Sequence, residues 1–229
     1  MPTKTKNQII TSTAVQKEET ISAMNIVRIA QATVDIPVTG ITPLIVHQFS
    51  EKAKKQMLDS DTTKVRGKKP PRNPEESYKQ SRYILDAALQ KESGAEDGFP
   101  AVGFKAAIVG AARLFDASVT MTALRSALYV QGYGSQQLVP VMGEHEMRED
   151  VVRVGQGVAD LRYRAMYPEW SALLTVKYIP TQISLEGVFA LVEAAGMGGI
   201  GEWRPSSPKS NTGSYGQFTI DMGILEAAV

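Results

Sequence analysis

The stretch GMGGIGEWRPSSPKSNTGSYGQF, residues 196 to 218, joins a helical pattern to the last apolar strand pattern of the chain. Four of its first six residues are glycines, namely Gly196, Gly198, Gly199 and Gly201. Glycine permits positive φ angles and lets the backbone approach a ligand or another segment closely. The stretch therefore predicts a helix-to-strand connection that is closely packed or lies beside a ligand.

The segments around this connection alternate between strand and helix patterns. Residues 172 to 178 alternate apolar and polar side chains, as a half-buried strand does, whereas residues 185 to 192 have apolar residues at helical spacing. The full prediction is a strand at 26–46, helices at 74–91 and 103–117, strands at 124–142 and 171–179, a helix at 184–195, and a strand at 215–221. This βαββαβ order predicts an α+β protein with a ferredoxin-like core.

We expect one ferredoxin-like domain over residues 25–229, preceded by a flexible N-terminal arm at 1–24, which is polar and lacks a sustained period. Two long insertions interrupt the domain, a basic loop at about 50–73 and a charged excursion at 143–169. The excursion is either a β-hairpin that turns near residues 155–157 or an irregular solvated segment.

Composition excludes several classes of protein. The chain has no cysteine, which rules out disulfides, thiolate metal sites and cysteine nucleophiles, and it fits a cytoplasmic protein. No apolar run approaches the roughly 18 residues of a membrane span, and the N-terminus lacks the apolar region of a secretory signal. The net charge is +1, so only a local concentration of charge could indicate nucleic acid. We expect no cofactor and no membrane partner.

Positive charge is concentrated locally in residues 64 to 82. The cations are Lys64, Arg66, Lys68, Lys69, Arg72, Lys79 and Arg82, and two tyrosines, Tyr78 and Tyr83, lie beside them. Lysine and arginine can neutralise phosphates, and tyrosines can stack on bases. The same charges could instead form a solvated loop that keeps the protein soluble. The pattern favours a nucleic-acid-binding surface.

The C-terminal order of strand, helix, glycine-rich loop and strand resembles the repeat-associated mysterious protein (RAMP) superfamily, which supplies backbone and processing subunits to CRISPR effector complexes. The matching residues are Gly198-Gly199-Ile200-Gly201-Glu202-Trp203-Arg204 and Gly213-Ser214-Tyr215-Gly216, together with the opening strand that leads into Gly40-Ile41-Thr42-Pro43-Leu44. The resemblance implies a RAMP-type or RNA-recognition-motif (RRM) type core and single-stranded nucleic acid held along an array of identical subunits. In such a site Gly198, Gly199, Gly201 and Arg204 would shape and charge the groove.

The two histidines differ in what they suggest. His47 follows the first strand, and in RAMP-like processing nucleases a histidine can act as general base on a 2′-hydroxyl, so His47 is a candidate catalytic residue. The alternative is a structural histidine. His145 is flanked by Glu144 and Glu146, which point to opposite faces of a strand, so we predict no metal site.

These features favour a protein that binds single-stranded nucleic acid, tolerates different sequences and assembles as a homo-oligomer or filament, rather than an enzyme. Two alternatives stay open. One is a metal-independent, RAMP-type endoribonuclease that uses His47. The other is a structural or assembly protein that binds no nucleic acid.

Overall fold

The computed structural model describes residues 28–48, 73–154, 158–208 and 213–227. These residues form an α+β protein with two antiparallel sheets and six α-helices, which confirms the predicted class. The larger sheet has the order β3 (Asp97–Pro100), β5 (Leu138–Met142), β8 (Ser171–Tyr178), β1 (Ala32–Gly40), β9 (Phe218–Ile220), and β4 (Leu128–Val130) also pairs with β8. The smaller sheet has the order β2 (Leu44–Val46), β7 (Val158–Tyr167), β6 (Glu146–Val154).

The pairing of β1 with β8 fixes which face of the larger sheet is buried. Ile36 lies opposite Leu174 and Val38 opposite Ala172, and all four side chains are buried in the main core. Asp35 lies opposite Thr175 on the other face, where the threonine hydroxyl donates to the carboxylate over 2.6 Å. The period of two predicted from the sequence therefore separates an apolar face from a polar one.

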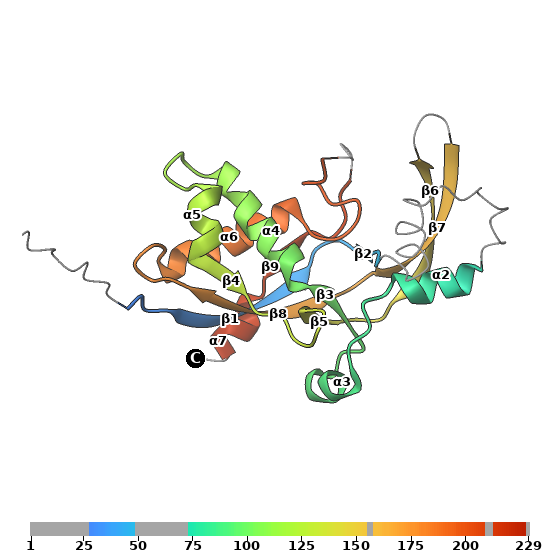
Figure 1. Ribbon diagram of the computed structural model, residues 1–229, viewed down its shortest axis with the longest axis horizontal. Helices are drawn as coiled ribbons and strands as arrows, with labels where there is room; N and C mark the ends of the chain where they lie inside the picture. Colours follow the sequence, from blue (N-terminus) through green and yellow to red (C-terminus); the bar gives the residue numbers. More distant parts are fainter. Residues whose placement is uncertain (1–27, 49–72, 155–157, 209–212, 228–229) are drawn as a thin grey trace, which may run out of the picture.

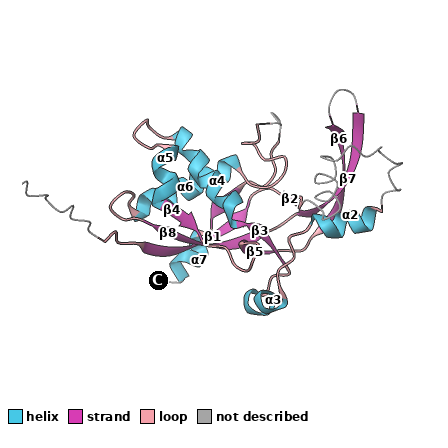
Figure 2. Cartoon of the chain, viewed as in Figure 1, coloured by secondary structure: helices cyan, strands magenta, loops and turns pink. Residues whose placement is uncertain are grey.

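Helices cover the apolar face. Figures 1 and 2 show α4 (Ala101–Ala111), α5 (Met121–Ala127) and α6 (Leu185–Gly198) together on one side of the sheet, with α7 (Met222–Ala227) near β1. α4 and α6 pack against each other, and α6 begins where predicted, because the hydroxyl of Ser184 accepts the backbone N–H of Gly187 over 3.1 Å. Phe104 of α4 contacts the ring of Phe218 of β9 edge-on and links helix to sheet.

The glycine-rich connection is packed rather than loose. A Cβ atom at Gly196 would lie 1.8 Å from the carbonyl oxygen of Phe218. Gly201 has a φ of +74°, and a Cβ atom there would lie 2.5 Å from the carbonyl oxygen of Ile45. The next residue, Glu202, donates its N–H to that same carbonyl over 2.8 Å. These glycines thus bring α6 onto β9 and the following loop onto β2.

The charged excursion forms a long hairpin, one of the two forms predicted for it. β6 and β7 pair from Glu146 opposite Met166 to Val154 opposite Val158. Figure 1 shows the hairpin extending away from the helices, with α2 (Pro74–Ser81) beside it. α2 packs against β7, and its N-terminus is capped, since the Asn73 side chain accepts the N–H of Glu76.

Several predicted boundaries were wrong. The helix expected at 74–91 is two helices, because the chain extends after Ser81 and α3 (Ala87–Ser93) begins anew at Asp86, whose carboxylate accepts the N–H of Leu89 over 2.9 Å. The strand expected from residue 124 is preceded by α5, which Thr120 caps. The helix expected at 103–117 ends with a short 3₁₀ turn, Ala112–Leu114. β3 and α7 were not predicted.

Two other predicted segments lie largely outside the residues that the structure describes. The N-terminal arm at 1–24 and residues 50–72 of the basic insertion lie beyond the described residues. Among the helices that are described, none has the length and apolar character needed to cross a membrane.

Candidate functional site

A cavity of about 510 Å³ lies between α4, α6 and the glycine-rich connection. Six residues that the sequence suggested as candidates line it, although they come from distant parts of the chain: His47, Tyr83, Gly198, Gly199, Gly201 and Arg204. The tertiary structure therefore brings the proposed groove-forming loop, the candidate histidine and one of the candidate stacking tyrosines to a single place.

The walls of the cavity differ in character. The α4 residues in the lining are all small: Gly103, Ala106, Ala107, Gly110 and Ala111. The ring of Phe99 packs on Gly103, where an added Cβ atom would lie 2.4 Å from it, and the ring of Tyr83 contacts Phe99 edge-on. Arg113, Glu202, Arg204 and Ser206 supply polar groups. An apolar wall with a few polar groups is the usual composition of a small-molecule or base-binding cavity.

His47 also lines the cavity, and its surroundings lower the pKa of its imidazole. Burial is the main cause that lowers its pKa to about 4, and the positive charges of Arg164 and Arg162 lower it further. The imidazole is therefore neutral at neutral pH. It is a weak base and carries no charge with which to attract phosphate.

Arg164 lies behind the rim of the cavity and is almost completely buried, with 2% of its side chain exposed. Its Nη1 donates to Oδ2 of Asp150 over 3.2 Å, and its Nη2 lies 3.6 Å from Oε2 of Glu202. Burial lowers the pKa of Arg164, while these two carboxylates oppose that effect. The guanidinium thus links the hairpin to the glycine-rich connection.

A second arginine strengthens that link. Arg148 of β6 donates from Nε to Oδ1 of Asp150 over 2.8 Å, and its guanidinium lies 4.8 Å from the ring centre of Tyr215. Its Nη1 also donates to the Tyr215 hydroxyl over 3.0 Å. Arg148 and Arg164 are thus both paired with Asp150.

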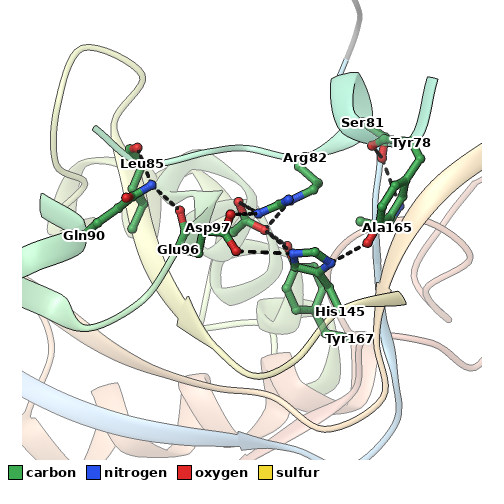
Figure 3. Close-up of polar contacts among 10 residues, drawn as sticks. All are labelled: Tyr78, Ser81, Arg82, Leu85, Gln90, Glu96, Asp97, His145, Ala165 and Tyr167. Carbon is green, nitrogen blue, oxygen red and sulfur yellow. Dashed lines mark hydrogen bonds and ion pairs between the residues drawn. The ribbon is translucent and has the colours of Figure 1, made fainter. Parts of the chain in front are cut away.

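A buried ionic cluster holds the base of the hairpin (Figure 3). Arg82 donates from Nε and Nη2 to the two carboxylate oxygens of Asp97, over 2.8 and 3.0 Å. The Tyr167 hydroxyl donates to Oδ2 of Asp97 over 2.5 Å, and the second acid, Glu96, lies 2.7 Å from Nη2 of Arg82. Burial, followed by the hydrogen bond to Asp97, raises the pKa of Tyr167, so its hydroxyl stays protonated as a donor.

His145 completes this cluster on the side of α2. The Tyr78 hydroxyl hydrogen-bonds to Nδ1 of His145, and Nε2 of His145 lies 3.5 Å from Glu96 and 3.8 Å from Asp97 (Figure 3). Burial is the main reason that the pKa of Tyr78 is raised. The cluster connects α2, β3, β7 and the segment before β6 through satisfied polar groups, which indicates a role in positioning the hairpin.

The structure thus separates the predicted site residues into groups. The cavity collects six of them, whereas Tyr78 and Arg82 belong to the ionic cluster, and Lys79 is exposed on α2. Lys64, Arg66, Lys68, Lys69 and Arg72 lie outside the described residues. Asp97, Arg113 and Glu202 were missed as site residues. Nothing in the local sequence marks Asp97 or Glu202, because their partners Arg82, Tyr167 and Arg164 are brought to them only by folding.

Comparison with known proteins yields one distant likeness to report. No family model matches the chain, and no curated protein matches it. Of the solved structures that do match, the crystal structure of Cmr6 from Pyrococcus furiosus is 9% identical in sequence, with a TM-score of 0.40, covering 85% of this chain and 100% of that one. Both similarity values are low, and the α+β class given above rests on the strands and helices of this chain itself.

Proposed function

We propose that this chain binds single-stranded nucleic acid with little dependence on sequence, and that it self-associates. The observation that carries the proposal is the cavity, where the glycine-rich connection meets Arg113 and Arg204. Arginine is suited to phosphate recognition, because its planar guanidinium can donate two hydrogen bonds to one phosphate.

The proposal includes a ferredoxin-like core of RAMP type in one domain, residues 25–229, with an arm at 1–24. The strand order β5, β8, β1, β9 supports it, because α4 follows β1, α6 follows β8, and the glycine-rich connection lies between α6 and β9. This is the arrangement expected of a βαββαβ unit with antiparallel neighbours.

The polar face of the larger sheet is a poorer place for a strand of nucleic acid than the side of the cavity. That face carries Asp35 and Thr175, which bond to each other, and the exposed Leu173. The acidic side chain of Asp35 on this face would repel phosphates. We therefore place the path of the nucleic acid along the edge of the cavity and along α2.

Specific residues follow from that path. Gly198, Gly199 and Gly201 would shape it, and Arg204, Lys79 and the basic residues Lys64, Arg66, Lys68, Lys69 and Arg72 would contact phosphates. Tyr83 remains a candidate for stacking at the cavity. Tyr78 is proposed only as a neighbour of the path, since its hydroxyl is engaged by His145. We leave Arg82 out, because Asp97 and Glu96 already engage its guanidinium.

Fluorescence anisotropy with labelled single-stranded DNA and RNA over a series of salt concentrations tests this proposal. We expect binding that weakens as salt rises, and a slope that falls by about 0.7 for each phosphate contact removed. The triple substitution Lys68→Ala, Lys69→Ala, Arg72→Ala should lower both affinity and slope. Lys91→Ala on α3 is the matched control and should leave them unchanged. Absence of binding at low salt, or an unchanged triple variant, would contradict the proposal.

Self-association is tested separately by size-exclusion chromatography. The mass of the eluted protein reports its oligomeric state, and the ratio of absorbance at the nucleic-acid and protein maxima reports whether nucleic acid is bound. An oligomer that carries no nucleic acid and shows no salt-dependent binding would favour the alternative of a structural or assembly protein.

The location of His47 in the cavity keeps the endoribonuclease alternative open. A general base works best when its pKa lies near the working pH, and a pKa of about 4 is unfavourable in that respect. Incubation of the protein with labelled RNA in the presence of a chelator tests whether it is a metal-independent endoribonuclease. Cleavage that His47→Ala abolishes would support the nuclease, and intact RNA would exclude it.

A further inference from the structure

The cavity has features that go beyond binding a chain of phosphates. Its α4 wall contains only glycine and alanine, and Phe99, which packs on Gly103, lines the cavity together with Tyr83. The small residues Ala106, Ala107 and Gly110 leave room for a planar ring, and about 510 Å³ is enough for one base with its sugar. Phosphates alone would need neither the small residues nor the aromatic rings.

Glu202 is the only acidic residue in the lining as far as the structure describes it. Its backbone N–H is fixed to the carbonyl oxygen of Ile45 over 2.8 Å, and its carboxylate lies 3.6 Å from the buried Arg164, which Asp150 holds in turn. The carboxylate is thus anchored at the rim while 41% of the side chain stays exposed. An anchored anion on a proposed phosphate path is unfavourable unless the ligand offers hydrogen-bond donors to it.

The nucleobases differ in how many hydrogen-bond donors they can offer to a carboxylate. A carboxylate has two oxygens that accept hydrogen bonds side by side. Guanine presents two adjacent donors, N1–H and the N2 amino group, which match them. Adenine and cytosine pair one donor with an adjacent acceptor, and the single N–H of thymine or uracil lies between two carbonyls, so each would place an acceptor against the anion.

Building on the proposed function, we infer that the cavity takes one guanine base turned out of the bound strand. The base lies against the glycine and alanine wall of α4, and Glu202 accepts hydrogen bonds from N1–H and the N2 amino group. Arg204 also lines the cavity; its Nη1 donates to the carbonyl oxygen of Gly201 over 2.8 Å, and its remaining N–H groups would contact the adjoining phosphate. Turning out a base of a single strand costs less than extracting it from a duplex. The strand as a whole is then held by charge, with preference at one position.

The test uses the full chain and labelled oligothymidylates that are identical except for one central position. That position carries guanine, hypoxanthine, adenine or thymine. We expect the guanine oligonucleotide to bind about tenfold more tightly than the thymine one, as a bidentate contact to a base typically discriminates. Hypoxanthine, which keeps N1–H but lacks the amino group, should fall between them.

Two variants locate the contact. Glu202→Gln should remove the preference for guanine, because the amide offers a donor where guanine needs an acceptor. Ala106→Trp, on the exposed side of α4, should remove it by filling the cavity. Glu186→Gln, at the start of α6, is the control and should keep the preference.

The outcomes separate this inference from the function on which it rests. Equal affinity for all four oligonucleotides, with salt-dependent binding intact, overturns the inference alone. A guanine preference that survives in both Glu202→Gln and Ala106→Trp also overturns it, since the contact then lies elsewhere. Absence of binding to every oligonucleotide at low salt overturns the proposed function together with the inference.

Discussion

Arg82 and Asp97 form a buried, two-point ion pair, with Nε to Oδ2 at 2.8 Å and Nη2 to Oδ1 at 3.0 Å. The aspartate is 1% exposed and the arginine 9%. The pair joins the segment after α2 to the edge strand β3, and Tyr167 extends the connection to β7. A contact between residues 15 positions apart thus fixes where the hairpin leaves the body of the protein.

Asp97→Asn should lower the free energy of unfolding by about 3 kcal/mol, because it leaves Arg82 with a neutral partner in a buried position. Chemical denaturation at neutral pH measures the loss. Glu96→Gln is the matched control, since Glu96 contacts the same guanidinium but is 62% exposed, and its loss should stay within about 1 kcal/mol. Equal losses for the two variants would show that burial of the pair is unimportant.

Gly201 and Gly110 differ in the space that a side chain would find at each position. Gly201→Ala should destabilise the protein by about 2 kcal/mol, because its φ is +74° and the new Cβ would lie 2.5 Å from the Ile45 carbonyl oxygen. Gly110→Ala, in α4, meets no atom within 4 Å and should stabilise by about 0.5 kcal/mol. Thermal unfolding of both variants measures the shifts. A neutral Gly201→Ala would contradict the close packing of the connection on β2.

The lowered pKa of His47 predicts a stability that depends on pH. The unfolded chain takes up a proton near the ordinary value of 6.5, whereas the folded chain does so only at about 4, so stability falls as pH drops through this window. Between pH 7.5 and pH 5 the loss should reach about 2 kcal/mol. The lowered pKa of Glu96 acts below its ordinary 4.5 and therefore outside this range.

His47→Asn removes the titrating group and should flatten the profile between those two pH values. Urea denaturation at each pH measures it. A slope that the substitution leaves unchanged would assign the pH dependence to other groups.

The link between Arg148 and Tyr215 should limit opening of the hairpin. Tyr215→Phe removes the hydrogen bond to Nη1 but keeps the ring under the guanidinium, whereas Tyr215→Ala removes both. Hydrogen exchange of the backbone amides of β6 and β7 should therefore accelerate more in Tyr215→Ala than in Tyr215→Phe. Identical exchange in all three proteins would show that the contact does not restrain the hairpin.

Local sequence patterns were sufficient for elements whose signals come from neighbouring residues. The alternation in β8 and the helical spacing of apolar residues in α6 were predicted correctly, because both periods are set by residues within a few positions of each other. The division between α2 and α3 was missed, since the chain there takes its place from contacts to β3 rather than from a strong local break. The same reason explains why Arg82 looked like a surface cation.

The sequence by itself determined the types of β1, β8, α4 and α6, the position of the glycine-rich connection before the last strand, and the concentration of charge at residues 64 to 82. Only the tertiary structure decided that His47, Tyr83 and Arg204 share one cavity, and that Arg82 forms a buried ion pair with Asp97. Shared cavities and charge pairs between distant residues depend on segments that meet only after folding, so no local pattern encodes them.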